Sequence, residues 1–267
     1  MTTLLLRRDG GICRQHGPPC RPCIEECQEP SVRTDYGWGM SQPYTTHDVS
    51  IGSLELPGRL VRPPDCNGLV VFAHGSGSSR LSPRNAHVAM HLNDHGFATL
   101  LFDLLSDQEA EDRRNVFDIP LLGNRVLEAL RWVRRQPDLA ALRIGIFGAS
   151  TGAAAALVAA AGATGDVQAV VSRGGRPDLA GEALRDVEAP TLLIVGGRDD
   201  DVLELNREAQ RQMRCLTRLV VVPGATHLFE EPGALDEAVA AAANWFARYL
   251  TGQVDDPGKL SRRSPPT

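Results

Sequence analysis

The chain has 267 residues, of which 42% are hydrophobic and 23% are charged, and its formal net charge is −5 at pH 7. The length fits one large α/β domain or two small ones, and the acidic balance argues against a nucleic-acid-binding protein, which needs a basic face. Every apolar run is shorter than the roughly 20 residues of a membrane-spanning helix, and the N-terminus lacks the apolar stretch of a signal peptide. We therefore expect a cytoplasmic protein that binds neither nucleic acid nor membranes.

The first 45 residues are rich in Pro, Gly, Arg and Cys and have no helical or strand periodicity, so we expect a poorly ordered extension. A start of translation at Met40 would place residues 1–39 upstream of the native protein. The extension holds a C-x6-C-x2-C-x3-C cluster with one histidine: Cys13, His16, Cys20, Cys23 and Cys27. We expect unstructured thiols here; zinc binding is the alternative, although the spacing lacks the paired C-x2-C knuckles of common zinc sites.

Regular apolar patterns begin near residue 46 and continue to residue 250, and a Pro-, Arg- and Ser-rich tail follows over residues 251–267. Short apolar runs predict strands over residues 49–56, 58–62, 69–73, 98–104, 142–147, 167–171, 191–195 and 218–222. Apolar residues at helical spacing predict helices over residues 84–94, 119–135, 153–161, 179–185, 203–214 and 235–250. Alternating strands and helices indicate an α/β fold with a mostly parallel sheet covered on both faces. Sites in such folds lie at the carboxyl edge of the sheet.

A G-x-S-x-G motif lies between the predicted strand 142–147 and the predicted helix 153–161, as Gly148-Ala149-Ser150-Thr151-Gly152. This is the sequence and context of a nucleophile elbow, in which a tight turn exposes the serine hydroxyl. Side chains at Gly148 and Gly152 would collide with neighbouring backbone, which is why glycine is needed there. The motif predicts that Ser150 is a nucleophile.

Two later strands are followed by the residues that would activate such a serine. Asp199 comes after the predicted strand 191–195, and His227 comes after the predicted strand 218–222. The order Ser, Asp, His is that of α/β-hydrolases. His227 would be the general base, and Asp199 would fix its tautomer and stabilise the imidazolium. Asp200 or Asp201 could instead cap the following helix, and Asp178 is an alternative acid.

The turn His74-Gly75-Ser76, directly after the predicted strand 69–73, could supply a backbone N–H to an oxyanion. We choose the Ser76 N–H as this donor. The Thr151 N–H at the start of the elbow helix would be the second donor.

These motifs together resemble the α/β-hydrolase superfamily, and within it the dienelactone-hydrolase-like group, over about residues 46–250. The stretches that carry the resemblance are HGSGSSR at 74–80, SPRN at 82–85, GASTG at 148–152, SRGGRPDLAG at 172–181, GGRDDDV at 196–202 and GATHLFEEPG at 224–233. Dienelactone hydrolase proper has a cysteine where this chain has Ser150. The resemblance therefore implies a serine hydrolase of small esters or thioesters that needs no metal or organic cofactor. Related-looking domains also occur fused to a phosphoribosyltransferase domain, for which the first 45 residues here are too short.

The segment between the predicted strands 167–171 and 191–195 is too short for a cap domain, so we expect an open, shallow site with a minimal lid or none. Four arginines are predicted near the active edge: Arg80, Arg84, Arg173 and Arg176. They could bind a substrate carboxylate or phosphate, or pair with acidic residues and hold loops in place. Acyl transfer or perhydrolysis by the same triad and a non-catalytic binding role remain the alternatives in function.

Overall fold

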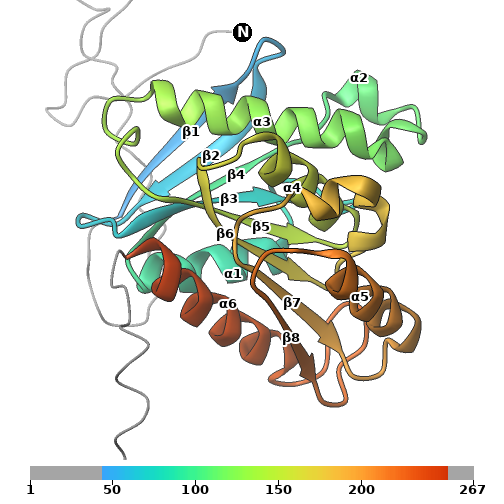
Figure 1. Cartoon of the computed structure of the whole chain (residues 1–267). Helices are drawn as coiled ribbons and strands as arrows, with labels where there is room; N and C mark the ends of the chain where they lie inside the picture. The colour runs from blue at the N-terminus through green and yellow to red at the C-terminus, as the bar shows by residue number, and fades with distance from the viewer. Residues whose placement is uncertain (1–43, 252–267) are drawn as a thin grey trace, which may run out of the picture. The chain divides into compact units, whose positions relative to one another are not determined.

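The computed structural model describes residues 44–251, in which eight strands form a single sheet. The strands are β1 (Thr45–Ile51), β2 (Leu56–Arg62), β3 (Gly68–Ala73), β4 (Phe97–Phe102), β5 (Ile144–Ala149), β6 (Val167–Arg173), β7 (Thr191–Gly196) and β8 (Thr217–Val222). Their order across the sheet is β1-β2-β4-β3-β5-β6-β7-β8 (Figure 1). β1 pairs antiparallel with β2, and β2 with β4. The other pairs are parallel, so β3 to β8 all end at one edge.

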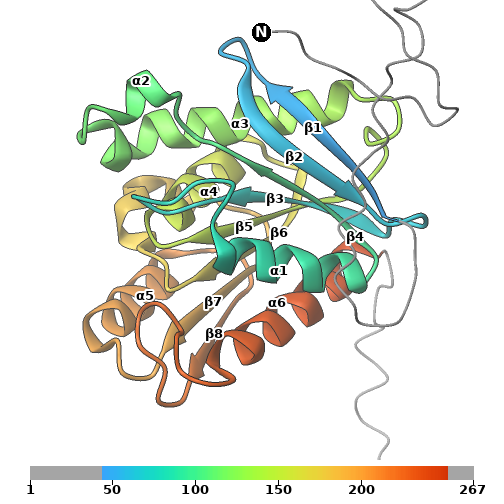
Figure 2. The same cartoon turned by 180° about the vertical axis from the view of Figure 1, so that it is seen from behind.

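Helices cover both faces of this sheet. One face carries α3 (Ile119–Arg135) and α4 (Thr151–Gly162), with the 3₁₀ segment η3 (Pro177–Arg185) and α5 (Asp200–Gln212) beside them. The other carries α1 (Pro83–Asp94) and α6 (Ala234–Leu250), which lie side by side in Figure 2. Two short helices, α2 (Asp107–Ala110) and η2 (Asn115–Phe117), connect β4 to α3.

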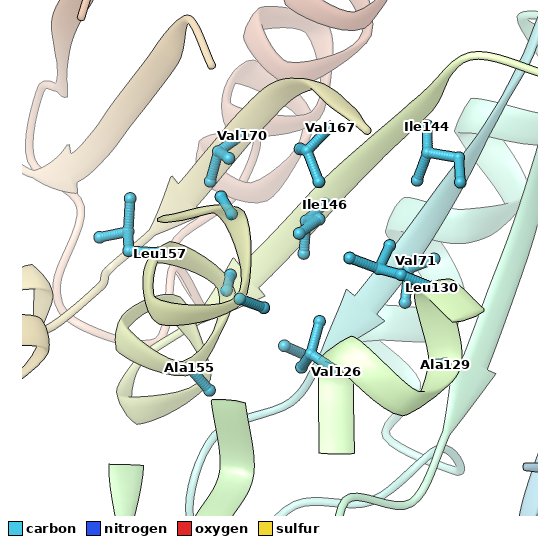
Figure 3. Packing of buried hydrophobic residues seen from close by; sticks show 14 of the residues in the cluster. Val71, Val126, Ala129, Leu130, Ile144, Ile146, Ala155, Leu157, Val167 and Val170 are labelled. Atoms are coloured by element: carbon cyan, nitrogen blue, oxygen red, sulfur yellow. The ribbon is translucent and has the colours of Figure 1, made fainter. Parts of the chain in front are cut away.

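Alternation along the buried strands divides the core into two layers. Val71 and Ile146 pack in the layer of α3 and α4, which Figure 3 shows from close by. Phe72 and Phe147 belong to the layer of α1 and α6, with ring centroids 5.0 Å apart. A parallel strand that is buried on both faces is expected to be apolar along its whole length, and β3 and β5 are.

The predicted α/β-hydrolase architecture without a cap domain is confirmed, since only η3 and its flanking loops separate β6 from β7. Apart from shifts of a few residues in other element bounds, three details differ. β1 ends at Ile51 rather than residue 56, because a turn at Gly52 and Glu55, both with positive φ, closes the β1–β2 hairpin. The helix predicted over residues 179–185 is a 3₁₀ segment with a kink at Gly181. The segments α2 and η2 were not predicted.

The predicted N-terminal extension, its cysteine cluster, the start at Met40 and the C-terminal tail lie outside the described residues, apart from their inner ends. Within residues 44–251, no helix combines the length and the apolar character that crossing a membrane requires.

Candidate active site

Ser150 occupies the turn between β5 and α4 with φ 52° and ψ −125°. A backbone conformation of this kind costs an L-residue on the order of 1–3 kcal/mol and persists only where its surroundings enforce it. Two hydrogen bonds do so, one to the last residue of β6 and one to the loop after it. The Ser150 N–H donates to the Arg173 carbonyl at 3.2 Å, and the Arg176 N–H donates to the Ser150 carbonyl at 3.1 Å. The serine is therefore held at the carboxyl edge of the sheet.

The glycines of the motif are required by close backbone contacts. A Cβ on Gly152 would lie 2.2 Å from the Ala73 carbonyl oxygen, and one on Gly148 would lie 2.5 Å from the Ala153 Cα. A Cβ on Gly75 would lie 2.9 Å from the Ser150 Cβ. Backbone cannot yield to the first two distances, so the turn after β5 can form and lie against the end of β3 only with glycine at positions 148 and 152, and Gly75 leaves room for the Ser150 side chain.

His227 and Asp199 are hydrogen-bonded through His227 Nδ1 and Asp199 Oδ2 at 2.7 Å. Asp199 precedes α5, where an aspartate usually caps the helix, but its side chain makes no capping bond. The carboxylate is therefore available to the histidine. Asp200 and Asp201 lie in the first turn of α5, and Asp178 forms an ion pair with Arg176 at 2.7 Å.

The loop that carries His227 is held by its own polar contacts. The Thr226 N–H donates to the Glu231 carboxylate at 3.1 Å, and hydrogen bonding with Thr226 lowers the pKa of Glu231. Phe229 is buried and has φ 56°. Gly196 of β7 allows this loop close approach, because a Cβ there would lie 2.4 Å from the Ala225 carbonyl oxygen.

Ser150 and His227 line the same depression, which has a volume of about 240 Å³. Ser150 Oγ makes no hydrogen bond to His227 among the residues that the structure describes. Catalytic hydrogen bonds often tighten only when substrate binds. The depression therefore brings together Ser150, whose backbone is constrained, and the imidazole of His227, which is hydrogen-bonded to a carboxylate.

The Ser76 N–H, predicted as an oxyanion donor, donates to the Thr151 hydroxyl at 2.8 Å. Thr151 is buried and is the first residue of α4, so its own N–H has no partner within the helix. Because Thr151 Oγ1 accepts the Ser76 proton, the hydroxyl proton of Thr151 is left to donate elsewhere. Sequence reasoning missed this hydrogen bond, since it depends on a contact between two turns far apart in the chain.

His74 also has a role that the sequence did not reveal. Its Nε2 accepts the Leu104 N–H at 3.2 Å, and its Nδ1 lies 3.1 Å from the Gly75 carbonyl oxygen. These contacts require a neutral ring with the proton on Nδ1, and burial of the ring lowers its pKa. His74 thus fixes the turn after β3 to the end of β4.

The four arginines of the active edge have different partners. Arg80 pairs with Asp103 through both its backbone N–H and its guanidinium, and Arg176 pairs with Asp178; neither arginine lines the depression. Arg84 and Arg173 do line it. Arg84 contacts Glu230 at 3.2 Å, whereas Arg173 makes no ion pair with any residue between 44 and 251.

A group of metal-ligating side chains lies between α1 and α6, outside the depression. Ligand atoms of His87, His91 and Asp236 are within 4.8 Å of one another, with His87 Nε2 2.8 Å from Asp236 Oδ1. These side chains could hold a metal ion, but none of the three lines the depression. A larger depression of about 590 Å³ lies at the opposite, amino edge of the sheet, and its thiol, Cys215, has a pKa raised by burial and is a poor nucleophile there.

A sheet of this topology, with a constrained residue in the turn after β5, is the arrangement of the α/β-hydrolase fold. The protein is a member of that class. Within it, the chain belongs to the dienelactone hydrolase family, whose family model matches residues 56–251. The family is one of hydrolases.

Solved structures agree with this assignment. A dienelactone hydrolase from Anabaena variabilis is 53% identical, with a TM-score of 0.76, and the match covers 79% of this chain and all of that one. A dienelactone hydrolase-like promiscuous phosphotriesterase from metagenomic libraries is 19% identical, with a TM-score of 0.65, over 78% of this chain and 99% of its own. The second likeness concerns the fold alone.

Curated relatives come from two strains of Mycobacterium tuberculosis and carry the provisional name phosphoribosyl transferase. They are 58% identical over 204 residues, which is 76% of this chain and 46% of theirs. The chain therefore spans about half the length of the curated relatives that it matches, and their name refers to the longer protein.

Proposed function

We propose that the protein is a serine hydrolase that cleaves small esters or thioesters through an acyl-enzyme on Ser150. The observation that carries this proposal is the 2.7 Å hydrogen bond between His227 and Asp199 at the edge where Ser150 is held in its constrained conformation. A serine hydroxyl is a weak nucleophile until an adjacent base takes its proton, and this pair is such a base with its orienting carboxylate.

In the first half of the reaction His227 Nε2 accepts the Ser150 proton while Oγ bonds to the substrate carbonyl carbon. The π electrons of the carbonyl move onto its oxygen, and Asp199 stabilises the imidazolium. Collapse of the tetrahedral intermediate breaks the C–O or C–S bond, and His227 protonates the departing alcohol or thiol. Water then attacks the acyl-enzyme with His227 again as base, which releases the carboxylic acid and restores Ser150.

The negative charge on the carbonyl oxygen needs donors that are already in place. We assign this role to the N–H and the hydroxyl of Thr151. The Ser76 N–H then acts by orienting the hydroxyl rather than by direct contact, because Thr151 Oγ1 accepts its proton. This refines the assignment made from the sequence, in which Ser76 was itself a donor.

No cap domain covers the described part of the site, and this supports small substrates with short acyl chains. A panel of p-nitrophenyl esters of increasing chain length tests this. Rates that are highest for acetate and butyrate support a shallow site, and a clear preference for long chains contradicts it.

The triad is tested with p-nitrophenyl acetate and two matched variants. Asp199→Asn is expected to lower kcat by about 10³–10⁴-fold, as loss of the orienting carboxylate does elsewhere. Asp178→Asn makes the same chemical change at the same edge, next to Arg176 instead of His227, and is expected to stay within about threefold of wild type. The reverse result would make Asp178 the acid.

Product analysis in the presence of an added alcohol separates hydrolysis from acyl transfer. Free acid as the main product supports the proposal, and the ester of the added alcohol as the main product supports an acyltransferase. Failure to turn over any ester of the panel would favour a binding protein on this scaffold.

A further inference from the structure

Arg173 is a buried cation beside the nucleophile. It ends β6, its carbonyl accepts the Ser150 N–H, and only 7% of its surface is exposed. Its Nε has no hydrogen-bond partner, and no carboxylate between residues 44 and 251 pairs with its guanidinium. Its charged group lies 5.6 Å from the centre of the Phe229 ring. Buried charges are normally paired, so this one needs an explanation.

The surroundings of Arg173 increase the cost of its charge. Burial, and to a smaller degree the charge of Arg84, lowers the pKa of Arg173 to about 10. Arg84 and Arg173 both line the depression that contains Ser150 and His227. Arg84 is paired with Glu230, whereas Arg173 has no carboxylate partner between residues 44 and 251. Two cations beside one small space therefore favour an anion in that space.

The other polar groups of the depression favour a phosphate over a carboxylate. Three serines, Ser76, Ser78 and Ser82, line it together with both arginines. Together these side chains supply more hydrogen-bond donors than the two oxygens of a carboxylate readily accept, whereas a phosphate monoester presents three terminal oxygens.

We propose that Arg173, together with Arg84, binds a phosphate group of the substrate, so that the natural substrate is a phosphorylated ester or thioester. This inference rests on the proposed hydrolase function for its catalytic part, but the phosphate site itself does not. Arg173 is placed to fix the substrate through bidentate hydrogen bonds, while the reacting carbonyl meets Ser150.

The first experiment measures binding of inorganic phosphate and needs no turnover. At matched ionic strength, about 10 mM phosphate is expected to raise Tm by about 3 °C or more, and acetate by less than about 1 °C. Arg173→Met is expected to abolish the phosphate effect and Arg173→Lys to weaken it. Arg176→Gln removes a guanidinium from the same edge that does not line the depression, and is expected to keep the effect in full.

The second experiment compares p-nitrophenyl esters that differ only in the end of a short acyl chain: 3-phosphonopropanoate, succinate and butyrate. The kcat/KM ratio of the phosphonate ester to the butyrate ester is expected to be about 10 or more in wild type, and to fall at least about tenfold in Arg173→Met. A ratio that Arg173→Met leaves unchanged would overturn the role of Arg173.

Preference for the succinate ester, or equal stabilisation by acetate and phosphate, would overturn phosphate as the recognised group. A phosphate effect on Tm that Arg173→Met does not remove would place the anion elsewhere. If phosphate binds through Arg173 and yet none of the three esters is cleaved, the hydrolase proposal fails while the phosphate site stands.

Discussion

Replacing Arg173 by methionine is expected to stabilise the fold, although it removes a charged residue next to the nucleophile. Burial, with a smaller contribution from the charge of Arg84, lowers the pKa of Arg173 in the folded state to about 10. At 1.36 kcal/mol for each tenfold change in proton affinity, the charged form costs about 3 kcal/mol in the folded state. Arginine is charged in both states at pH 7, so this cost is present in full at neutral pH.

Some of that gain is offset in the variant. Methionine keeps most of the apolar packing of the arginine stem but loses the contact of the guanidinium with the Phe229 ring, which is worth on the order of 1 kcal/mol. The net expectation is a gain of about 1–2 kcal/mol. For a domain of this size, that corresponds to a rise in Tm of roughly 2–8 °C.

Calorimetry and urea unfolding in a phosphate-free buffer measure this directly. Arg176→Met is the control, because it removes an arginine that is paired with Asp178 at the surface, and it is expected to cost at most about 1 kcal/mol. A loss of 1 kcal/mol or more in Arg173→Met would refute the reasoning, since it would mean that the fold already satisfies the charge of Arg173.

Three further outcomes are expected. Gly152→Ala places a Cβ 2.2 Å from the Ala73 carbonyl oxygen and should cost more than about 3 kcal/mol, so soluble protein with wild-type Tm would contradict the packing of the elbow. Thr151→Val, compared with Thr151→Ser, should lower kcat about 10–10²-fold, because it removes the hydroxyl donor with little change in shape; equal kcat for both variants would eliminate that donor. Burial lowers the pKa of His74, so protonation favours the unfolded state and stability should decline as the pH falls below the ordinary histidine value of about 6.5. The imidazolium cannot accept the Leu104 N–H, and a His74→Asn variant that shows the same decline in Tm between pH 7.5 and 5 would contradict this.

Much of the fold could be predicted because its central strands are buried on both faces. Runs such as residues 69–73 are apolar throughout, and the helix predicted over residues 119–135 has the bounds that the structure gives to α3. The end of β1 was misplaced because the apolar residues Leu54 and Leu56 follow Ile51 closely in the sequence, although Leu54 lies exposed in the hairpin turn. The short α2 and η2 have no apolar face long enough to show a period.

The candidate site was predictable where the fold alone fixes position. Turns after parallel strands meet at one edge, and this is why residues far apart in the chain, such as Ser150 and His227, could be named together. The pairing of side chains was not predictable, because it depends on which loops touch. The sequence could not show that Arg80 meets Asp103 while Arg173 meets no carboxylate within residues 44–251, nor that Ser76 donates to Thr151.

The most direct test of the central proposal is the identity of the residue that a fluorophosphonate modifies. Activated serines react with this reagent, and peptide mass spectrometry locates the adduct. The adduct is expected on Ser150 of the wild-type protein, at one equivalent per chain, and is expected to disappear in Ser150→Ala. An unreactive wild-type protein, or an adduct that persists in Ser150→Ala, would contradict Ser150 as the nucleophile.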